Sequence, residues 1–350
     1  MSDYSIKFFD KKSFNLLEED WKSLEKGADM TVFQSYDWNK MLVDVYLPDD
    51  SRNYESRFVL VKHEGKAVLI APLWIVKHDF RIVNKKGVFL LGKEGWSDYL
   101  NCIYDYFDKD AFMFLLYQVS DNYKVKRFVF EDVKEKTQSC IFIRSRFTDL
   151  RVEKGGCVSL SLPHTLAEYS SILSKNSRQN IRTAYNRLSK DSHRIEFLFN
   201  DELVSKDQCA EIRDRKLTNQ YEKVSKLRKF KYRMQNKLRF HFQTYSPMYD
   251  FRQSRIMSAY IDGNLCAFFN YVVDENNQTI VVMAAGTDLN YARYSPGVLL
   301  MYSFIQSQIE NESSIRVVDF TRGEEKYKFA LGGSLSHNCN LYFSLTNLKR

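Results

Sequence analysis

The most constraining feature of this 350-residue sequence is an order of predicted elements that occurs twice. In each half, periodic apolar segments indicate two strands joined by a tight turn, a third strand, a helix and a last strand. These segments are 57–65, 66–76, 86–92, 108–122 and 124–133 in the first half, and 255–289 (three strands), 297–310 and 314–320 in the second. The matching hairpins read HEGK at 63–66 and IDGN at 261–264. We therefore expect two similar α/β domains.

The length of the chain fits this organisation, because two domains of about 150 residues each are typical. We place the N-terminal domain at residues 1–155 and the C-terminal domain at residues 156–350. The connection is expected around residues 150–165, through Gly155 and Gly156.

Several classes of protein are excluded by composition. The longest nearly uncharged apolar run, residues 67–76, is far shorter than the roughly 20 residues that cross a bilayer. The N-terminus has no basic segment followed by an apolar one, so we expect no secretion and a cytoplasmic protein. The six cysteines and six histidines are scattered and make no metal-binding spacing. We expect no metal site, no disulfide framework and no transmembrane segment.

Positive charge is concentrated in one region. Residues 175–240 contain 18 Lys or Arg and 8 Asp or Glu. Two helical segments in 165–240 hold this charge, and the first starts with a capping box of Thr165 and Glu168. Ile181, Tyr185 and Leu188 are spaced to form its buried stripe, and the cations of another face are Lys175, Arg178 and Arg182.

The basic face has two possible meanings, a solvated surface or a site for a phosphate-bearing ligand. No zinc finger, RNA-recognition signature or basic zipper is present, so we expect no sequence-specific DNA binding. A tRNA or a nucleotide-linked substrate remains possible, because phosphates require only positive charge.

The segment YSPGVLLMYSFIQSQIE at 294–310 starts a helix in an unusual way. Ser295 is expected to cap the helix and Pro296 to occupy its first position. The free amides of Gly297 and Val298, with the helix dipole, would then form an anion site. The alternative is a capped helix with a purely structural role.

An aromatic loop, GKEGWSDYLN at 92–101, follows a predicted strand in the N-terminal half. Trp96, Asp98 and Tyr99 combine aromatic rings with a carboxylate, which is a common way to bind sugars or amines. We assign the loop to the binding of a sugar or amine substrate, and the alternative is an exposed loop closed by a packed Trp96. The segment FQSYDWNKML at 33–42 is expected to be a structural helix.

Four segments together carry a family resemblance: 294–310, then RVVDFTRGEEKYKFALGG at 316–333, with 33–42 and LSKNSRQNIRTAYNRL at 173–188 upstream. Over roughly residues 30–340 the chain resembles acyltransferases with two GNAT-type domains, including the CelD-like proteins of polysaccharide loci. It is distantly similar to the Fem-type peptidyltransferases. The resemblance implies an α/β (α+β) fold of two tandem GNAT-like domains, each a mixed, mostly antiparallel sheet flanked by helices.

The resemblance also implies a mechanism without a permanently bound cofactor. An amine attacks the thioester of acetyl-CoA or another acyl-CoA, which requires positioned reactants and stabilisation of an oxyanion. The acyl-CoA would lie between the strands of 279–289 and 314–320, where the amide of Met283 or Ala284 polarises the carbonyl. The other donor-binding residues implied are Arg293, Ser295, Gly297 and Val298.

Proton transfer is implied for residues near the end of the last strand. Asp319, or Glu325 if the loop folds back, would accept the amine proton, and Tyr327 would protonate the thiolate. Arg322 and Lys328 would bind phosphate or a substrate carboxylate. Structural alternatives are that Asp319 caps a turn, that Tyr327 lies in the core, and that Lys328 pairs with Glu324.

The chain departs from the GNAT pyrophosphate-loop pattern, Q/R-x-x-G-x-G/A, because Pro296 stands at its first glycine. Fem-type relatives depart similarly and use aminoacyl-tRNA. Our leading hypothesis is an N-acyltransferase that moves an acetyl or related group from acyl-CoA to an amino sugar or surface-polysaccharide precursor. The alternatives are an aminoacyl-tRNA-dependent peptidyltransferase acting on a cell-wall precursor and a noncatalytic protein that binds a nucleotide-linked glycan.

Overall fold

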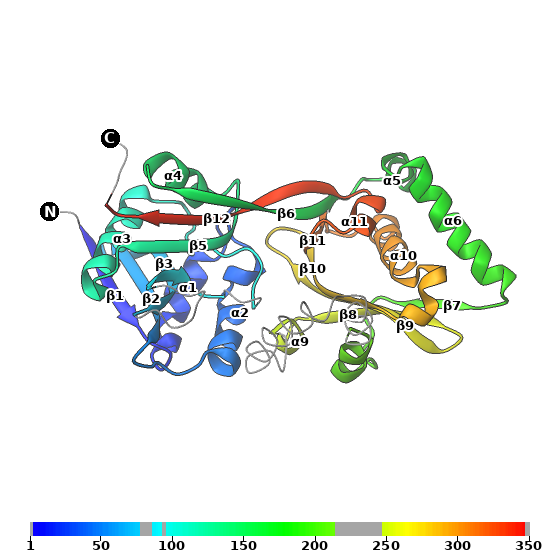
Figure 1. Cartoon of the computed structure of the whole chain (residues 1–350), viewed down its shortest axis with the longest axis horizontal. Helices are drawn as coiled ribbons and strands as arrows, with labels where there is room; N and C mark the ends of the chain where they lie inside the picture. The colour runs from blue at the N-terminus through cyan, green and yellow to red at the C-terminus, as the bar shows by residue number, and fades with distance from the viewer. Residues whose placement is uncertain (1–2, 78–85, 93–95, 214–246, 347–350) are drawn as a thin grey trace, which may run out of the picture. The chain divides into compact units, whose positions relative to one another are not determined.

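The computed structural model describes residues 3–77, 86–92, 96–213 and 247–346. The chain divides into two compact units (Figure 1). Unit 1 comprises residues 1–156 and 336–350, and unit 2 comprises residues 157–335. Each unit contains a mixed, mostly antiparallel sheet flanked by helices, which confirms the predicted fold class.

Unit 1 is built on the strand order β1-β2-β3-β4-β5-β12. Only β4 and β5 are parallel to each other. Its strands are β1 (Tyr4–Phe9), β2 (Tyr54–His63), β3 (Lys66–Val76), β4 (Gly87–Leu90), β5 (Arg127–Lys134) and the later part of β12 (Ser334–Ser344). Its helices are η1 (Phe14–Leu17), α1 (Glu18–Leu24), η2 (Val32–Gln34), α2 (Tyr36–Met41), η3 (Leu42–Tyr46), α3 (Lys109–Tyr123) and α4 (Gln138–Arg146).

The segment 33–42 of unit 1, predicted as one structural helix, forms η2 and α2, which are separated by the extended residue Ser35. Trp38 of α2 is fully buried, and its ring meets that of Phe33 edge-on with centroids 5.0 Å apart. The indole N–H donates to Oγ of Ser97 at 2.8 Å. Aromatic packing and a satisfied indole explain why this segment is fixed in the core.

Unit 2 has the strand order β6-β11-β10-β9-β8-β7, in which only β10 and β11 are parallel. Its strands are β6 (Arg151–Ser161, which begins in unit 1), β7 (Ile195–Leu198), β8 (Arg255–Ile261), β9 (Asn264–Asp274), β10 (Thr279–Thr287) and β11 (Val317–Arg322). Its helices include α5 (Leu166–Ile172), α6 (Lys175–Lys190), α9 (Pro247–Asp250), η4 (Leu289–Tyr294), α10 (Pro296–Glu310) and α11 (Lys326–Ala330).

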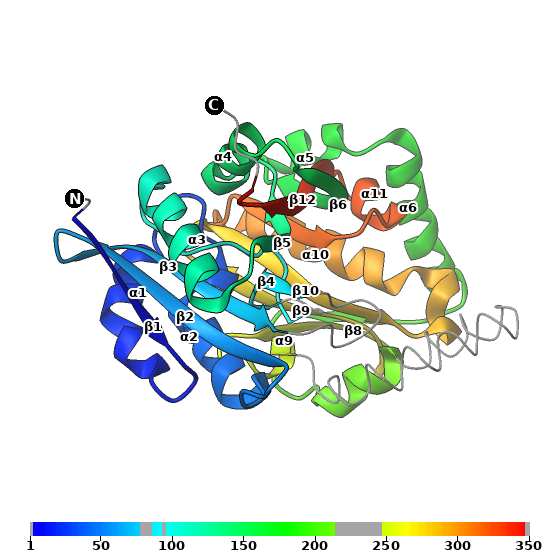
Figure 2. The same cartoon turned by 60° about the vertical axis from the view of Figure 1, so that its left-hand side comes forward.

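The two faces of the unit 2 sheet are covered differently. On one face, here called the helical face, side chains of α5, α6 and α10 form the main core cluster with Phe269 and Phe320. Figure 1 and Figure 2 both show α10 between the strands and α6. On the other face, here called the opposite face, Phe268 packs with Val204, Cys209 and Ile212. Alternation along the strands decides which face each side chain meets.

Two boundaries differ from the sequence expectation. The first basic helix is two helices, because Ser174 stops α5 and caps α6 by accepting the N–H of Ser177 at 3.0 Å. Gly155 and Gly156 lie inside strand β6, at the boundary between the two units. Residues 336–350, which we assigned to the C-terminal domain, group with unit 1 because β12 pairs along β5. The predicted capping box of Thr165 and Glu168 is confirmed.

Candidate functional site

The parallel strands β10 and β11 separate partway along their length. Their ladder joins residues 279–281 to residues 317–319. Beyond it, β10 continues to Thr287 and β11 to Arg322. We call the point of separation, at Val281 and Asp319, the fork. Beyond the fork, the facing backbone groups of the two strands do not belong to a common ladder.

Both strands have irregular backbone at the fork. The register of β10 against β9 shifts between Val282 and Ala284, so Met283 is the extra residue of a bulge. The register of β11 shifts within residues 319–322, where Thr321 has a left-handed φ of 57°. Oγ1 of Thr321 donates to the carbonyl of Val282 at 3.1 Å and ties the strands together there. Met283 and Ala284 therefore lie two and three residues beyond Val281, the last residue of β10 that pairs with β11.

Asp319 is the last residue of β11 that pairs with β10, and its side chain lies on the opposite face. Val318 and Phe320 belong to the helical-face core, and neighbouring strand side chains alternate between faces. The residue is 6% exposed, and Oδ1 accepts the N–H of Thr321 at 2.8 Å. Asp319 thus makes the turn contact that we considered as an alternative, and it does so at the fork.

Tyr327 lies on the helical face, in α11. Its ring centroid is 6.2 Å from that of Phe269 and 6.3 Å from that of Phe320. Burial, and then the negative charge of Glu325, raise the pKa of the Tyr327 phenol. The phenol therefore stays protonated at ordinary pH and can serve as a proton donor.

The loop from Arg322 to Lys328 is closed by its own lysine. Gly323 has φ of 100°, and a Cβ added there would lie 2.6 Å from Oε2 of Glu325. Nζ of Lys328 donates to the carbonyls of Arg322 (2.7 Å) and Gly323 (3.1 Å) and pairs with Glu325 at 2.8 Å. The ion pair is with Glu325 and not with Glu324. Because Lys328 is 3% exposed and makes these contacts inside the loop, it has no surface for a phosphate.

The start of α10 differs from the expected anion site. Ser295 has φ of 51°, and its side chain makes no capping hydrogen bond, so the expected hydroxyl cap is wrong. The N–H of Val298 donates to the carbonyl of Ser295 at 3.0 Å and is not free. Gly297 is buried, and an added Cβ would lie 2.8 Å from Oγ1 of Thr287. Gly297 therefore serves close packing of α10 on the end of β10, and Pro296 occupies the first helical position as predicted.

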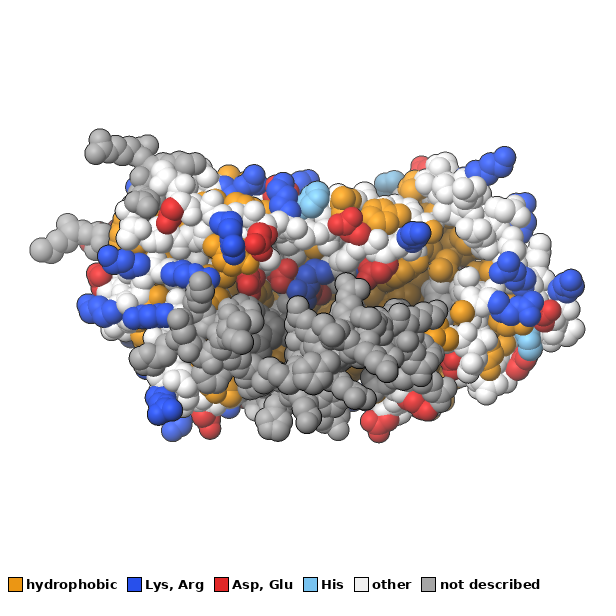
Figure 3. Space-filling model, viewed as in Figure 1, with side chains coloured by type: hydrophobic (Ala, Val, Ile, Leu, Met, Phe, Trp, Pro, Cys, Tyr) orange, Lys and Arg blue, Asp and Glu red, His pale blue; other side chains and the backbone are white. Residues whose placement is uncertain are grey.

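A pocket of about 190 Å³ lies between α6 and the start of α10. It is lined by Ser177, Asn180, Ile181, Thr183, Ala184, Arg187, Ser295, Val298, Leu299 and Ala330. Nη1 of Arg187 donates to the carbonyl of Arg293 at 2.8 Å. Figure 3 shows Lys and Arg side chains gathered at the end of unit 2 where α6 lies. A guanidinium among hydroxyl and carboxamide groups suits a phosphate-bearing ligand.

Sequence reasoning missed this pocket because it chose another face of the same helix. Residues 180, 183, 184 and 187 have the spacing of one helical face, which was the available signal. Of the three cations selected instead, Arg178 donates to the carbonyls of Ser170 (2.7 Å) and Leu173 (2.6 Å) at the end of α5. Lys175 and Arg182 are exposed, and none of the three lines the pocket.

Arg293 lies next to the pocket but is engaged by its neighbours. Its Nη2 is 3.0 Å from Oδ2 of Asp191, which also accepts the Tyr294 hydroxyl at 2.7 Å. The hydrogen bond from Tyr294, with help from the charge of Arg293, lowers the pKa of the Asp191 carboxyl. Arg293 is otherwise exposed, so part of its guanidinium faces solvent.

The aromatic loop of unit 1 is packed and not open. Trp96 and Tyr99 are buried. The carbonyl of Tyr99 accepts Nε2 of Gln34 at 2.5 Å, and Nζ of Lys134 lies 4.1 Å from the Tyr99 ring centroid. Asp98 is half-buried. Neither ring presents an open face to a sugar, so the packed alternative describes Trp96 and Tyr99.

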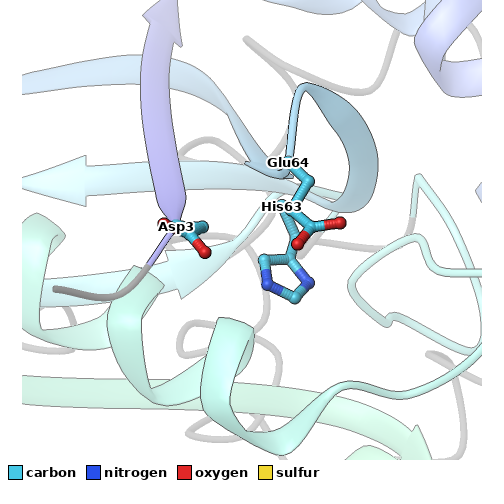
Figure 4. Close-up of side chains that lie close together, drawn as sticks. All are labelled: Asp3, His63 and Glu64. Carbon is cyan, nitrogen blue, oxygen red and sulfur yellow. The ribbon is translucent and has the colours of Figure 1, made fainter.

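One group of potential metal ligands occurs among the described residues. Ligand atoms of Asp3, His63 and Glu64 lie within 4.8 Å of one another. Figure 4 shows Asp3 beside β1 and the other two residues at the β2–β3 hairpin. Asp3 and Glu64 are exposed, and exposed acidic groups are common without an ion, so we assign no metal role to them.

The second basic helical segment lies mainly in 214–246, outside the described residues. Its preceding part, 206–213, is helical, and Cys209 and Ile212 of this part pack on the opposite face. Among the helices in the described ranges, none is long and apolar enough to cross a membrane.

Comparison with known proteins identifies the family signal in unit 2. The profile of the acetyltransferase (GNAT) domain family, Acetyltransf_6, matches residues 175–329, which include α6, α10, the fork and the Lys328 loop. None of the curated proteins matches the sequence.

The structure of FemX aligns over 97% of both chains with a TM-score of 0.58 and 10% identity. A conserved protein of unknown function from Bacteroides thetaiotaomicron aligns over 97% of this chain and 100% of its own, with a TM-score of 0.54 and 11% identity. At such identities the likeness concerns the fold alone.

Proposed function

Because this chain carries a GNAT acetyltransferase domain in residues 175–329, we propose that it is an N-acyltransferase that uses acetyl-CoA or a related acyl-CoA. The acceptor is an amino sugar or another precursor of surface polysaccharide or cell envelope. Unit 2 binds the donor and unit 1 lies on the acceptor side. The single observation that carries the proposal is the fork between β10 and β11, which begins at Asp319.

The proposed reaction uses both faces of the sheet at the fork. The amine nitrogen bonds to the acyl carbon while the amide of Met283 or Ala284 stabilises the oxyanion. The carbon–sulfur bond then breaks. Asp319 takes the amine proton, directly or through water, from the opposite face, and Tyr327 gives its phenolic proton to the thiolate from the helical face. These positions follow from strand alternation and from the aromatic neighbours of Tyr327.

The proposed phosphate-binding groups are those of the pocket between α6 and α10. Arg187 supplies positive charge, and Ser295 and Val298 line the pocket from the start of α10, with Arg293 next to it. Gly297 remains in the proposal because its close packing on Thr287 fixes the position of this helix start. Asp98 is half-buried and remains proposed to bind the acceptor. Arg322 is exposed and remains proposed to bind phosphate or a substrate carboxylate. Lys328, Trp96 and Tyr99 are not part of the proposed site.

Calorimetric titration with acetyl-CoA tests this proposal. We expect binding that weakens about tenfold in Arg187→Ala, because a charge-assisted hydrogen bond is lost. Gly297→Val is expected to weaken binding further, because its side chain has no room against Thr287 and would displace the start of α10, which lines the pocket. Arg182→Ala, a change on the exposed face of the same helix, is the control and should leave the affinity within about twofold. Equal losses in Arg187→Ala and Arg182→Ala would refute the assignment of the pocket.

The alternatives are separated by the same titration with a second ligand. Binding of an aminoacyl-tRNA pool without acetyl-CoA binding would favour the Fem-type peptidyltransferase, which the basic composition of 175–240 and the fold likeness to FemX make worth testing. Binding of neither donor would favour a noncatalytic protein that holds a nucleotide-linked glycan.

A further inference from the structure

One buried carboxamide near the fork is only half satisfied. Asn270 of β9 is 1% exposed, and its Nδ2 donates to Oγ of Ser254 at 2.5 Å. Among the residues that the structure describes, Oδ1 of Asn270 has no hydrogen-bond partner. A buried polar atom without a partner is unfavourable and rare in native proteins, so it requires an explanation.

The place of Asn270 in the sheet suggests the explanation. It lies opposite Ala284 in β10, the residue that follows the Met283 bulge, and opposite Ile256 in β8. Since the flanking Phe269 and Tyr271 belong to the helical-face core, Asn270 points to the opposite face, as Asp319 does. The adjacent Ala284 is small and half-buried. A polar end without a partner therefore lies beside the proposed site of transfer.

The separation of Asn270 from Asp319 fits a small ligand between them. Asp319 of β11 pairs with Val281 of β10, and Val281 pairs with Val272 of β9. Asn270 lies two residues from Val272 along β9, toward the open end of the fork. Strand spacing and rise place the two Cα atoms about 12 Å apart. Two side chains and one small amine between them can cover this distance.

We propose that Asn270 binds a hydroxyl group of the acyl acceptor and so positions its amine between Asp319 and the bulge at Met283. This inference rests on the proposed acyltransferase function and narrows the acceptor to a hydroxylated amine. A hydroxyl both donates and accepts, so it pairs with the unpartnered end whichever way the carboxamide is oriented. Asn270 is a positioning residue, because it holds the acceptor and takes no part in proton transfer.

The test compares two amines as acceptors with acetyl-CoA as donor, measured by release of the CoA thiol. D-glucosamine carries hydroxyl groups and cyclohexylamine carries none. We expect Asn270→Leu to lower the ratio of their kcat/KM values about tenfold or more, because a site built to bind a hydroxyl group discriminates strongly against an analogue without one. The different basicities of the two amines cancel when this ratio is compared between variants.

A matched control is available in unit 1. Asn338 of β12 is also buried, and within the described ranges its Nδ2 has no hydrogen-bond partner, but it belongs to unit 1 and not to unit 2, which carries the fork. Asn338→Leu is expected to leave the ratio within about twofold of the wild type. If Asn270→Leu does not fold, Asn270→Ala removes the same carboxamide without adding a larger side chain.

The outcomes separate this inference from the proposed function. Loss of discrimination in the Asn270 variant, with acetyl-CoA affinity retained, supports the inference. An unchanged ratio in that variant overturns it, and so does donor binding without turnover of either amine. Absence of acetyl-CoA binding to the wild-type protein refutes the proposed function itself, and the calorimetric titration shows this independently of any acceptor.

Discussion

Replacing Asp319 with asparagine is expected to lower kcat for acyl transfer about a hundredfold or more, with little change in the affinity for acetyl-CoA. Asparagine has the same shape and its carbonyl oxygen can still accept the N–H of Thr321, which Asp319 accepts at 2.8 Å. The local turn should therefore remain. What is lost is the carboxylate that takes the amine proton at the fork.

This expectation is checked by thiol-release kinetics together with calorimetry of acetyl-CoA. Glu310→Gln, a change of an exposed carboxylate at the end of α10, is the matched control and should retain wild-type kcat. Tyr327→Phe should lower kcat about tenfold or more, since it removes the proton donor without removing the ring. If Asp319→Asn is as active as Glu310→Gln, Asp319 is not the base. A selective loss in Glu325→Gln would then move that role to Glu325.

The elements that carry the fork could be predicted from sequence because each is a long periodic segment. The helix expected at 297–310 is α10, Pro296–Glu310, and the strand expected at 314–320 is β11, Val317–Arg322. Apolar periodicity and the Pro-Gly start are local properties of the sequence, so they can be recognised without knowing which segments pack against the helix or strand. The GNAT-type resemblance that these segments carry is confirmed for residues 175–329.

Side-chain roles near the ends of these elements could not be predicted in the same way. Ser295 has the residue type of a helix cap, yet its φ of 51° turns the side chain away from that role. Lys328 looks like an exposed cation four residues after Glu324, yet it is buried and bonded to backbone carbonyls. Both outcomes depend on the loop conformation, which residue type and spacing do not determine.

Strand pairing between segments that are distant in the chain could not be predicted from the sequence either. Gly155 and Gly156 lie at the boundary between the units, but the sequence does not show that they continue one strand, β6. Residues 338–344 of β12 pair with β5 from about 200 positions away. Asn270 interrupts an apolar strand, CAFFNYVV, in which a single polar residue is unremarkable. Only the register of β9 against β10 shows that it lies beside the bulge.

Replacing Lys328 with methionine is expected to lower the free energy of unfolding by about 3 kcal/mol. Methionine is of similar length and is apolar, so the volume is largely retained. The carbonyls of Arg322 and Gly323 lose their donor at a residue that is only 3% exposed, and Glu325 loses its ion pair. Leaving such groups unpaired is costly, whereas the net gain from making the bonds is modest.

Urea unfolding followed by circular dichroism measures this effect, and Lys326→Met supplies the control in the same helix. Lys326 is exposed, so its replacement should change the free energy of unfolding by less than about 0.5 kcal/mol. Equal stability of the two variants would show that Lys328 is not needed to close the loop. In that case Lys328 would be free to serve a ligand, and acetyl-CoA binding by Lys328→Met would become the deciding measurement. If the variant is destabilised but still binds acetyl-CoA at low temperature, Lys328 supports the loop and not the donor.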